Sequence, residues 1–216
     1  MEIYNLKSEK YKTKTVNVFF CDELKKETAS YNSLIVSILA RGTTLYPTLG
    51  DIARYGQELY GTKIYSDVDK KGEIQIMSFT VTVVDKNFLN DSDDIFKKAV
   101  DLLYSVIFDP LIENECFKDD YVEQEKVNLC DLIESKINDK NYYASYRCFE
   151  EMCTGEPYSI DENGDLEIIA LIENKKLYEY YKNTFIKKIP VKIFVTGNLE
   201  DEDILYVKNK FGDDNG

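Results

Sequence analysis

The sequence predicts an α+β domain with a mostly antiparallel sheet and helices packed mainly on one face of that sheet. Hydrophobic residues make up 44% of the 216-residue chain, which is enough to bury a core. Apolar residues recur at helical spacing in some segments and alternate in others, so both kinds of element are expected. In residues 73–84, apolar residues alternate with Ser78, Thr80 and Thr82, which is typical of a strand with one buried side and one wetter side.

The first part of the chain predicts a strand, two helices and a hairpin. These elements span residues 13–20, 27–40, 48–61, 62–69 and 73–84. β-Branched and aromatic residues predict the strands, and apolar residues at helical spacing predict the helices. Gly42 follows the first helix, where a left-handed residue ends a helix at little cost. Thr48 and Asp51 form a capping-box pattern at the start of the second helix, and Gly72 lies in the hairpin turn.

The second part predicts four helices, a strand and a closing helix. These elements span residues 95–108, 118–138, 142–152, 166–185, 191–196 and 201–211. Pro110 ends the first of these helices, because proline lacks the N–H that the next turn needs. No low-complexity linker interrupts the pattern, so residues 1–212 are predicted to form a single domain and residues 213–216 to begin a linker or a disordered tail.

Composition excludes several classes of function. The chain carries 27 Lys and Arg against 40 Asp and Glu, a net charge of −13, which argues against binding to nucleic acid or to an anionic membrane. It contains no histidine, so it cannot supply a Ser-His-Asp triad or a two-histidine zinc motif. Residues 1–11 are polar, which does not fit a signal peptide. The five cysteines form no C-x-x-C pair, so we expect reduced thiols and a cytoplasmic location.

For metal binding and for the charged helix face, an ordinary structural role explains the same residues. Residues 91–94 and 161–165 have the composition of calcium loops without their spacing, so both are interpreted as solvated acidic loops. The charged side chains of residues 123–136, among them Glu125 and Lys136, are interpreted as a solvated, ion-paired helix face. Composition alone suggests two Ser-Lys nucleophile pairs, Ser66 with Lys70 and Ser33 with Lys26.

Three stretches carry a resemblance to a known family. They are residues 33–61 with their Arg41-Gly42-Thr43 and Leu59-Tyr60-Gly61, residues 62–84, and residues 191–212. In this order they are similar to the zinc helix with the helix after it, the hairpin, and the terminal strand and helix of the pitrilysin-type peptidases, which include insulin-degrading enzyme and the mitochondrial processing peptidase. The resemblance implies an N-terminal domain with the fold of LuxS and the processing peptidases.

Catalytic members of that family carry H-x-x-E-H, in which two imidazoles bind zinc and the glutamate activates water. Aligned on the residues that close the helix, the histidines fall on Ser33 and Ser37 and the glutamate on Val36. The third zinc ligand falls near Asp131 and Leu132. Hydroxyl groups and a valine cannot replace these ligands and this base. The resemblance therefore implies an inactive branch of bacterial homologues, with no catalytic residue, no metal and no cofactor.

The resemblance also implies partners. Family members have two such domains in one chain, which form a clam-shell around a chamber, and inactive members tend to be encoded beside a catalytic relative. We therefore expect a second homologous domain, a catalytic partner subunit in a dimer, and an extended peptide substrate. In the family, peptides add a strand to the sheet edge that maps here onto Thr62, Lys63, Ile64, Tyr65 and Ser66. The alternative for this edge is that another domain merely covers it.

Three functions follow from these observations. The first is a non-catalytic domain that encloses or holds peptide and leaves hydrolysis to a zinc-bearing subunit. The second is a metal-dependent peptidase whose site is completed by residues outside this chain. The third is a scaffold or interaction domain that makes no contact with peptide.

Overall fold

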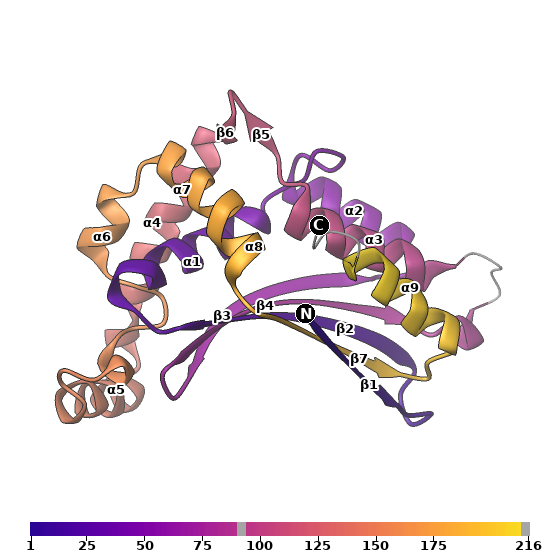
Figure 1. Cartoon of the computed structure of the whole chain (residues 1–216), viewed down its shortest axis with the longest axis horizontal. Coiled ribbons are helices and arrows are strands. Elements are labelled where there is room, and N and C mark those ends of the chain that lie inside the picture. The colour runs from indigo at the N-terminus through magenta and orange to yellow at the C-terminus, as the bar shows by residue number, and fades with distance from the viewer. Residues whose placement is uncertain (90–93, 213–216) are drawn as a thin grey trace.

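A five-stranded sheet carries the helices mainly on one of its faces (Figure 1). The structure is a computed structural model that describes residues 1–89 and 94–212. In the sheet, the strand order is β1-β7-β2-β4-β3, and β1 runs parallel to β7 while the other neighbours are antiparallel. The strands are β1 (Glu2–Lys7), β2 (Thr13–Glu23), β3 (Lys63–Lys71), β4 (Ile74–Val84) and β7 (Val191–Gly197). The predicted fold class is therefore confirmed.

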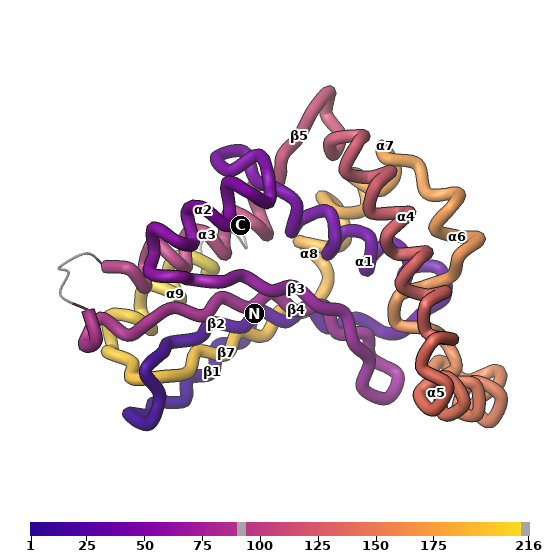
Figure 2. Tube along the Cα trace, turned by 180° about the vertical axis from the view of Figure 1, so that it is seen from behind, coloured from indigo at the N-terminus to yellow at the C-terminus, as the bar shows by residue number. Residues whose placement is uncertain are grey.

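The helices and short elements form the second layer. The α-helices are α1 (Lys26–Leu39), α2 (Leu49–Glu58), α3 (Ile95–Phe108), α4 (Asp119–Ser135), α5 (Lys140–Met152), α6 (Leu166–Leu171), α7 (Asn174–Tyr180), α8 (Ile186–Lys188) and α9 (Asp201–Gly212). The short elements are η1 (Lys86–Phe88), β5 (Ile112–Glu113), β6 (Cys116–Phe117), η2 (Lys136–Asn138), η3 (Pro157–Ser159) and the π-helical turn η4 (Tyr181–Phe185). Figure 2 shows α4 running down to α5, which stands apart from the other helices.

The core lies between the sheet and the helices. Alternate residues of β2, including Val16, Val18 and Phe20, are fully buried, and so are Met77 and Phe79 of β4. Because side chains alternate along a strand, these residues all face the helices and their neighbours face the other side. The predicted apolar alternation in residues 73–84 is thereby confirmed.

The predicted helix starts are close to those of the structure. The left-handed turn predicted at Gly42 is wrong, because Gly42 does not have positive φ; a Cβ there would come within 2.3 Å of the Pro47 carbonyl oxygen. Thr48 caps α2 in a full capping box with Asp51, as predicted. The hairpin turn is shorter than predicted, because Lys70 and Lys71 belong to β3 and only two residues, Gly72 and Glu73, connect the strands. Gly72 adopts φ +59°, which glycine tolerates at no steric cost.

Two elements differ from the prediction. Residues 2–7, interpreted as a polar terminus, form β1, because β7 pairs with their backbone and Phe194 stacks on Tyr4 at 4.9 Å between ring centroids. The helix predicted over residues 166–185 is interrupted at Ile172 and Glu173, which are extended. On one straight helix, Ile172 and Leu177 would point about 140° apart. The interruption lets both side chains be buried.

Two predicted features lie at or beyond the edge of the described chain. The acidic loop of residues 91–94 lies outside the described residues except for Asp94, whose carboxylate caps α3 by accepting from the Lys97 backbone. The tail predicted for residues 213–216 lies outside them as well. Across residues 1–89 and 94–212, no helix has both the length and the apolar character needed to cross a membrane.

A buried ion pair fixes α9 against the sheet. Lys14 occupies a core position of β2, and its Nζ lies 2.7 Å from Asp203 Oδ2. Asp203 Oδ2 also accepts from the backbone of Glu200 at the start of α9, while Lys14 Nζ lies 5.3 Å from the centre of the Phe96 ring. Both charges are thus satisfied by each other and by polar or aromatic neighbours.

We predict that Lys14→Met destabilises the domain by about 3 kcal/mol or more, because it leaves the Asp203 carboxylate buried without its partner. Lys14→Met combined with Asp203→Asn should recover most of that loss, since the amide is neutral and still accepts from Glu200. Urea unfolding of the two variants measures both effects. Lys7→Met, which removes an exposed pair with Asp201, is the control and should change little. Equal losses in the single and the double variant would contradict the assignment.

Candidate functional site

The positions predicted for a lost zinc motif lie on α1 and α4, which pack against each other. Ser33 and Val36 are buried on α1, and Ser37 is half-buried one turn after Ser33. Leu132 lies on α4 and is 50% exposed. An ion pair of 3.3 Å between Arg41 at the end of α1 and Glu125 of α4 joins the two segments.

The serine hydroxyl groups at these positions are engaged with backbone. Ser33 Oγ donates to the carbonyl of Glu162 at 2.8 Å, and Ser37 Oγ donates to the Ser33 carbonyl of its own helix at 3.2 Å. A hydroxyl that donates to a carbonyl has no base to accept its proton, so neither serine is set up as a nucleophile.

A buried glutamine is the centre of the polar network around Ser33. Gln75 has no exposed surface, and its Nε2 lies 2.6 Å from the Glu162 carbonyl, 3.1 Å from the Ala29 carbonyl and 3.3 Å from Ser33 Oγ. Its Oε1 accepts from Asn32 Nδ2 at 2.8 Å. The network thus joins β4, α1 and the loop of residues 161–165. The sequence analysis did not identify Gln75. The signal for it is that an amide stands on the same side of β4 as the apolar residues Met77 and Phe79.

The network has little capacity for acid–base chemistry. Asn32, Ser33 and Gln75 do not titrate near neutral pH. Tyr180 donates to Asn32 Oδ1 at 3.0 Å, and burial, followed by the charge of Asp22, raises the pKa of its hydroxyl. A neutral tyrosine with a raised pKa holds its proton rather than accepting one.

The loop of residues 161–165 lies against α1 over the same turns. Gly164 adopts φ +99°, and a Cβ atom there would come within 2.2 Å of Ser30 Oγ and 2.5 Å of Ser30 Cα. Only glycine permits this approach. The Asp165 backbone donates to Ser30 Oγ at 2.9 Å, and the Asp165 carboxylate caps α6. The loop therefore covers α1 at Ser30 and Ser33.

Charged groups hold the loop from its other side. Lys136 Nζ lies 2.5 Å from Asp161 Oδ2 and 3.2 Å from Glu162 Oε1, and its side chain is 9% exposed. Burial lowers the pKa of Lys136, but the attraction of the two carboxylates outweighs it and the pKa is raised. Lys70 donates to the carbonyls of Tyr158 and Ile160.

The interpretation of these charges as solvated is wrong for Lys136, for Asp161 and for Glu125, which is 8% exposed. Each of these side chains is covered by a partner that lies far away in the sequence, so its burial cannot be predicted from local pattern.

The predicted Ser-Lys pairs are engaged elsewhere. Lys26 Nζ lies 3.1 Å from Asp165 Oδ2, and this hydrogen-bonded partner raises the pKa of the amine, whereas a lysine base needs a lowered pKa. Lys70 donates to backbone carbonyls, as described above. Over residues 1–89 and 94–212, no group of three or more His, Cys, Asp or Glu side chains is placed to hold a metal ion.

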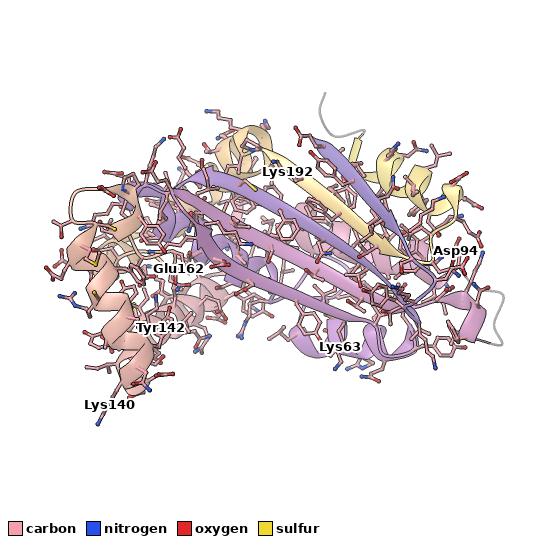
Figure 3. All side chains as sticks on the ribbon, turned by 90° about the horizontal axis from the view of Figure 1, so that it is seen from below. Lys63, Asp94, Lys140, Tyr142, Glu162 and Lys192 are labelled. Carbon is pink, nitrogen blue, oxygen red and sulfur yellow. The ribbon has the colours of Figure 1, made fainter. Side chains whose placement is uncertain are left out.

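The segment predicted to bind peptide lies at a sheet edge. Lys63, Ile64, Tyr65 and Ser66 begin β3, and Thr62 precedes it. Within residues 1–89 and 94–212, β3 pairs with β4 alone. In a hairpin with a two-residue turn, the two residues that flank the turn exchange backbone hydrogen bonds, and here these are Lys71 and Ile74. Along an antiparallel ladder, every second residue of β3 is then hydrogen-bonded to β4 in the same way. The backbone groups of Ile64 and Ser66 therefore point away from β4. Their side chains are half-buried, while those of Lys63 and Tyr65 are exposed. Figure 3 shows Lys63 at this edge of the sheet.

The other face of the sheet carries an apolar hollow. Figure 3 shows this face without covering helices across most of its area. A hollow of about 600 Å³ spans β2, β3, β4 and β7. It is lined by Asn17, Phe19, Cys21, Asp67, Asp69, Lys71, Ile76, Ser78, Lys192 and Phe194. Phe194 stacks on Tyr4 and meets Phe19 edge-on at 5.7 Å between ring centroids.

The chain is similar to known proteins in sequence and in structure. The chain is 30% identical over 206 residues to the probable inactive metalloprotease YmfF of Bacillus subtilis (strain 168), which covers 95% of this chain and 48% of that protein. A conserved protein from Enterococcus faecalis V583 matches in structure with a TM-score of 0.87 and 26% identity, over 97% of this chain and 49% of the other.

A peptidase M16 inactive domain from Pseudomonas fluorescens matches with a TM-score of 0.74 and 15% identity, over 97% of this chain and 47% of the other. The chain thus spans about half the length of these relatives, at 48%, 49% and 47%. No family model matches the sequence.

We predict that Gln75→Met destabilises the domain by about 2 kcal/mol or more, because Asn32 and two backbone carbonyls each lose a hydrogen bond inside the core. Methionine has a similar shape, so the loss reports hydrogen bonding rather than volume. Ser37→Ala is the matched control and should stay within about 0.5 kcal/mol, since that hydroxyl bonds within its own helix. Urea unfolding measures stability, and amide exchange of residues 161–165 should speed up in the Gln75 variant alone. An unchanged exchange rate would show that the network does not hold the loop.

Proposed function

The chain is an inactive domain of the pitrilysin type, the M16 peptidases, and from this premise we propose that it is the non-catalytic half of a longer protein that encloses extended peptides. One observation carries the proposal. Ser33, at a predicted histidine position, donates to the Glu162 carbonyl beside the buried Gln75 amide, where a catalytic relative would need a metal ligand. The domain is a non-catalytic homologue, so its role lies in binding.

A second domain of the same protein is the partner that we propose first. The relatives are about twice as long as this chain, which covers 48% of the Bacillus protein. The apolar hollow on the uncovered sheet face, with Phe19, Ile76 and Phe194, is the kind of surface that a packed neighbour covers. We infer that the second domain lies against this face.

We propose further that extended peptide pairs with β3. Main-chain pairing needs only free backbone donors and acceptors, which Ile64 and Ser66 offer at the edge. This interaction requires no metal and no ionisable side chain. It is therefore compatible with a domain that has lost catalysis.

The proposal has two further parts, a catalytic partner and a cellular location. A zinc-bearing partner subunit, assembled with this protein as a dimer, would perform the hydrolysis. A cytoplasmic location is supported by five cysteines that are all free thiols. The alternative of a peptidase completed by residues outside this chain requires a metal held from beyond α1, and the scaffold alternative requires that peptides do not bind at all.

We predict that the full-length protein neither binds zinc tightly nor cleaves an unfolded peptide in a metal-dependent way. Calorimetric titration with zinc and a fluorogenic peptide assay, each repeated with a chelator, measure these properties. A single tight zinc site, or cleavage that the chelator abolishes, would favour the peptidase alternative and refute our proposal.

We predict that Ser66→Pro weakens binding of a labelled unfolded peptide. The substitution removes an N–H that points outward and leaves the ladder to β4 intact, as proline at a sheet edge can. Losing one main-chain hydrogen bond of about 1 kcal/mol should raise Kd roughly fivefold in fluorescence anisotropy. Tyr65→Ala is the matched control, because it shortens a neighbouring side chain and keeps every backbone donor. Absence of any binding to the unsubstituted protein would favour the scaffold alternative.

A further inference from the structure

We propose that α5 is a docking arm whose exposed apolar stripe packs against the second half of the full-length protein. This inference rests on the proposed function in one respect, namely that a second half exists. It assigns a surface that neither the zinc-motif positions nor the β3 edge involve. The argument starts from how little of α5 the rest of the domain covers.

Helix α5 has no buried residue, although it is 13 residues long. Its main contacts within the described chain are with η2 and η3, the short elements that flank it in sequence. Figure 1 shows α5 beyond the end of the sheet, level with the tip of the β3–β4 hairpin and below the other helices. The tip of the arm, at Lys140 and Tyr142, points away from the domain in Figure 3.

The exposed side of α5 is apolar. At 100° per residue, one stripe of about 120° contains the following residues. They are Asn141, Tyr142, Ser145, Cys148, Phe149 and Met152, of which Asn141 and Ser145 are polar. Tyr142 and Phe149 are each 50% exposed and Met152 is 73% exposed, while the Cys148 thiol donates to Met152 Sδ at 3.6 Å. An amphipathic helix normally turns such a stripe toward a core. Here the half-buried side that faces the domain is a different one, with Tyr143, Tyr146 and Glu150.

The domain holds the arm in one orientation. Tyr146 donates to Asp161 Oδ2 at 2.9 Å, and the Lys136 ammonium lies 4.8 Å from the centre of the same ring. Phe149 meets Tyr158 edge-on at 6.1 Å between ring centroids. These contacts fix the direction of the stripe without covering it. A surface ordered before binding loses little conformational entropy when a partner docks.

The occupant that fits this surface is the remaining half of the protein. The relatives have about as much chain again beyond the matched region, since the match covers 48% of the Bacillus protein and 49% of the Enterococcus protein. A second copy of this chain is disfavoured, because each copy carries a net charge of −13 and the copies repel. Helix α5 also stands at one end of the uncovered sheet face, where the second half is proposed to lie (Figures 1 and 3).

The test is the alkylation rate of cysteine thiols in the full-length protein, compared with the same protein unfolded in urea. Cys148 lies on the stripe and is exposed in this domain, so docking should slow its alkylation at least about tenfold. Met152→Asp should restore most of the unfolded rate, because a carboxylate in the docked stripe would be buried unpaired. Glu151→Ala, an exposed residue of the same helix that lies outside the stripe, is the matched control and should leave the protection unchanged.

A thiol introduced by Lys192→Cys on the uncovered sheet face separates this inference from the proposed function. Protection of both thiols supports the docking arm and the proposed second domain. Protection of the sheet-face thiol with rapid alkylation of Cys148 would overturn the docking arm alone. Rapid alkylation of both would overturn the arm and the proposed second domain. Protection of Cys148 that grows with protein concentration would identify a second copy as the occupant and overturn the choice made here.

Discussion

The structure depends on one constraint, which is that the buried amide of Gln75 must find hydrogen-bond partners inside the core. An unpaired amide there would cost about as much as a large core substitution. The partners come from α1, through Asn32 and Ser33, and from the carbonyl of Glu162. Satisfying Gln75 therefore brings the loop of residues 161–165 against α1. Gly164, the ion pairs of Lys136 and the position of α5 all follow from where that loop lies.

This arrangement joins α1 and α4 around the positions predicted for the zinc motif. A zinc ion ligated from two helices would cross-link them strongly. In this chain, Arg41 pairs with Glu125 between α1 and α4, and Lys136 extends from the end of α4 to Asp161 and Glu162. Hydrogen bonds and ion pairs thus connect the same elements. Such contacts hold a geometry but activate neither water nor a nucleophile, so the fold is kept and the chemistry is not.

The sequence predicts the parts of the fold that depend on local chemistry. Thr48 and Asp51 identify the start of α2, and the alternation that begins at Met77 identifies the buried side of β4, because both signals involve neighbours in the chain. β1 was missed, since its polar residues become a strand only by pairing with β7. The burial of Lys136 was missed for the same reason, because its partner Asp161 lies 25 residues further on. For the candidate site, the residue types at Ser33, Val36 and Ser37 predict that zinc chemistry is absent, but nothing local indicates that Glu162 closes over them.

The two uncovered surfaces of the domain have a common physical meaning. Proteins that act alone rarely leave contiguous aromatic and aliphatic side chains in water, and this domain does so on the sheet face around Phe194 and on α5 around Met152. The sheet-face hollow combines these apolar residues with Asp67, Asp69, Lys71 and Lys192, whereas the α5 stripe carries no charged side chain. A net charge of −13 keeps copies of the domain apart, while apolar surfaces favour a neighbour that is tethered and therefore present at high effective concentration. Both surfaces are therefore consistent with the proposal that a second part of the same protein packs against this domain.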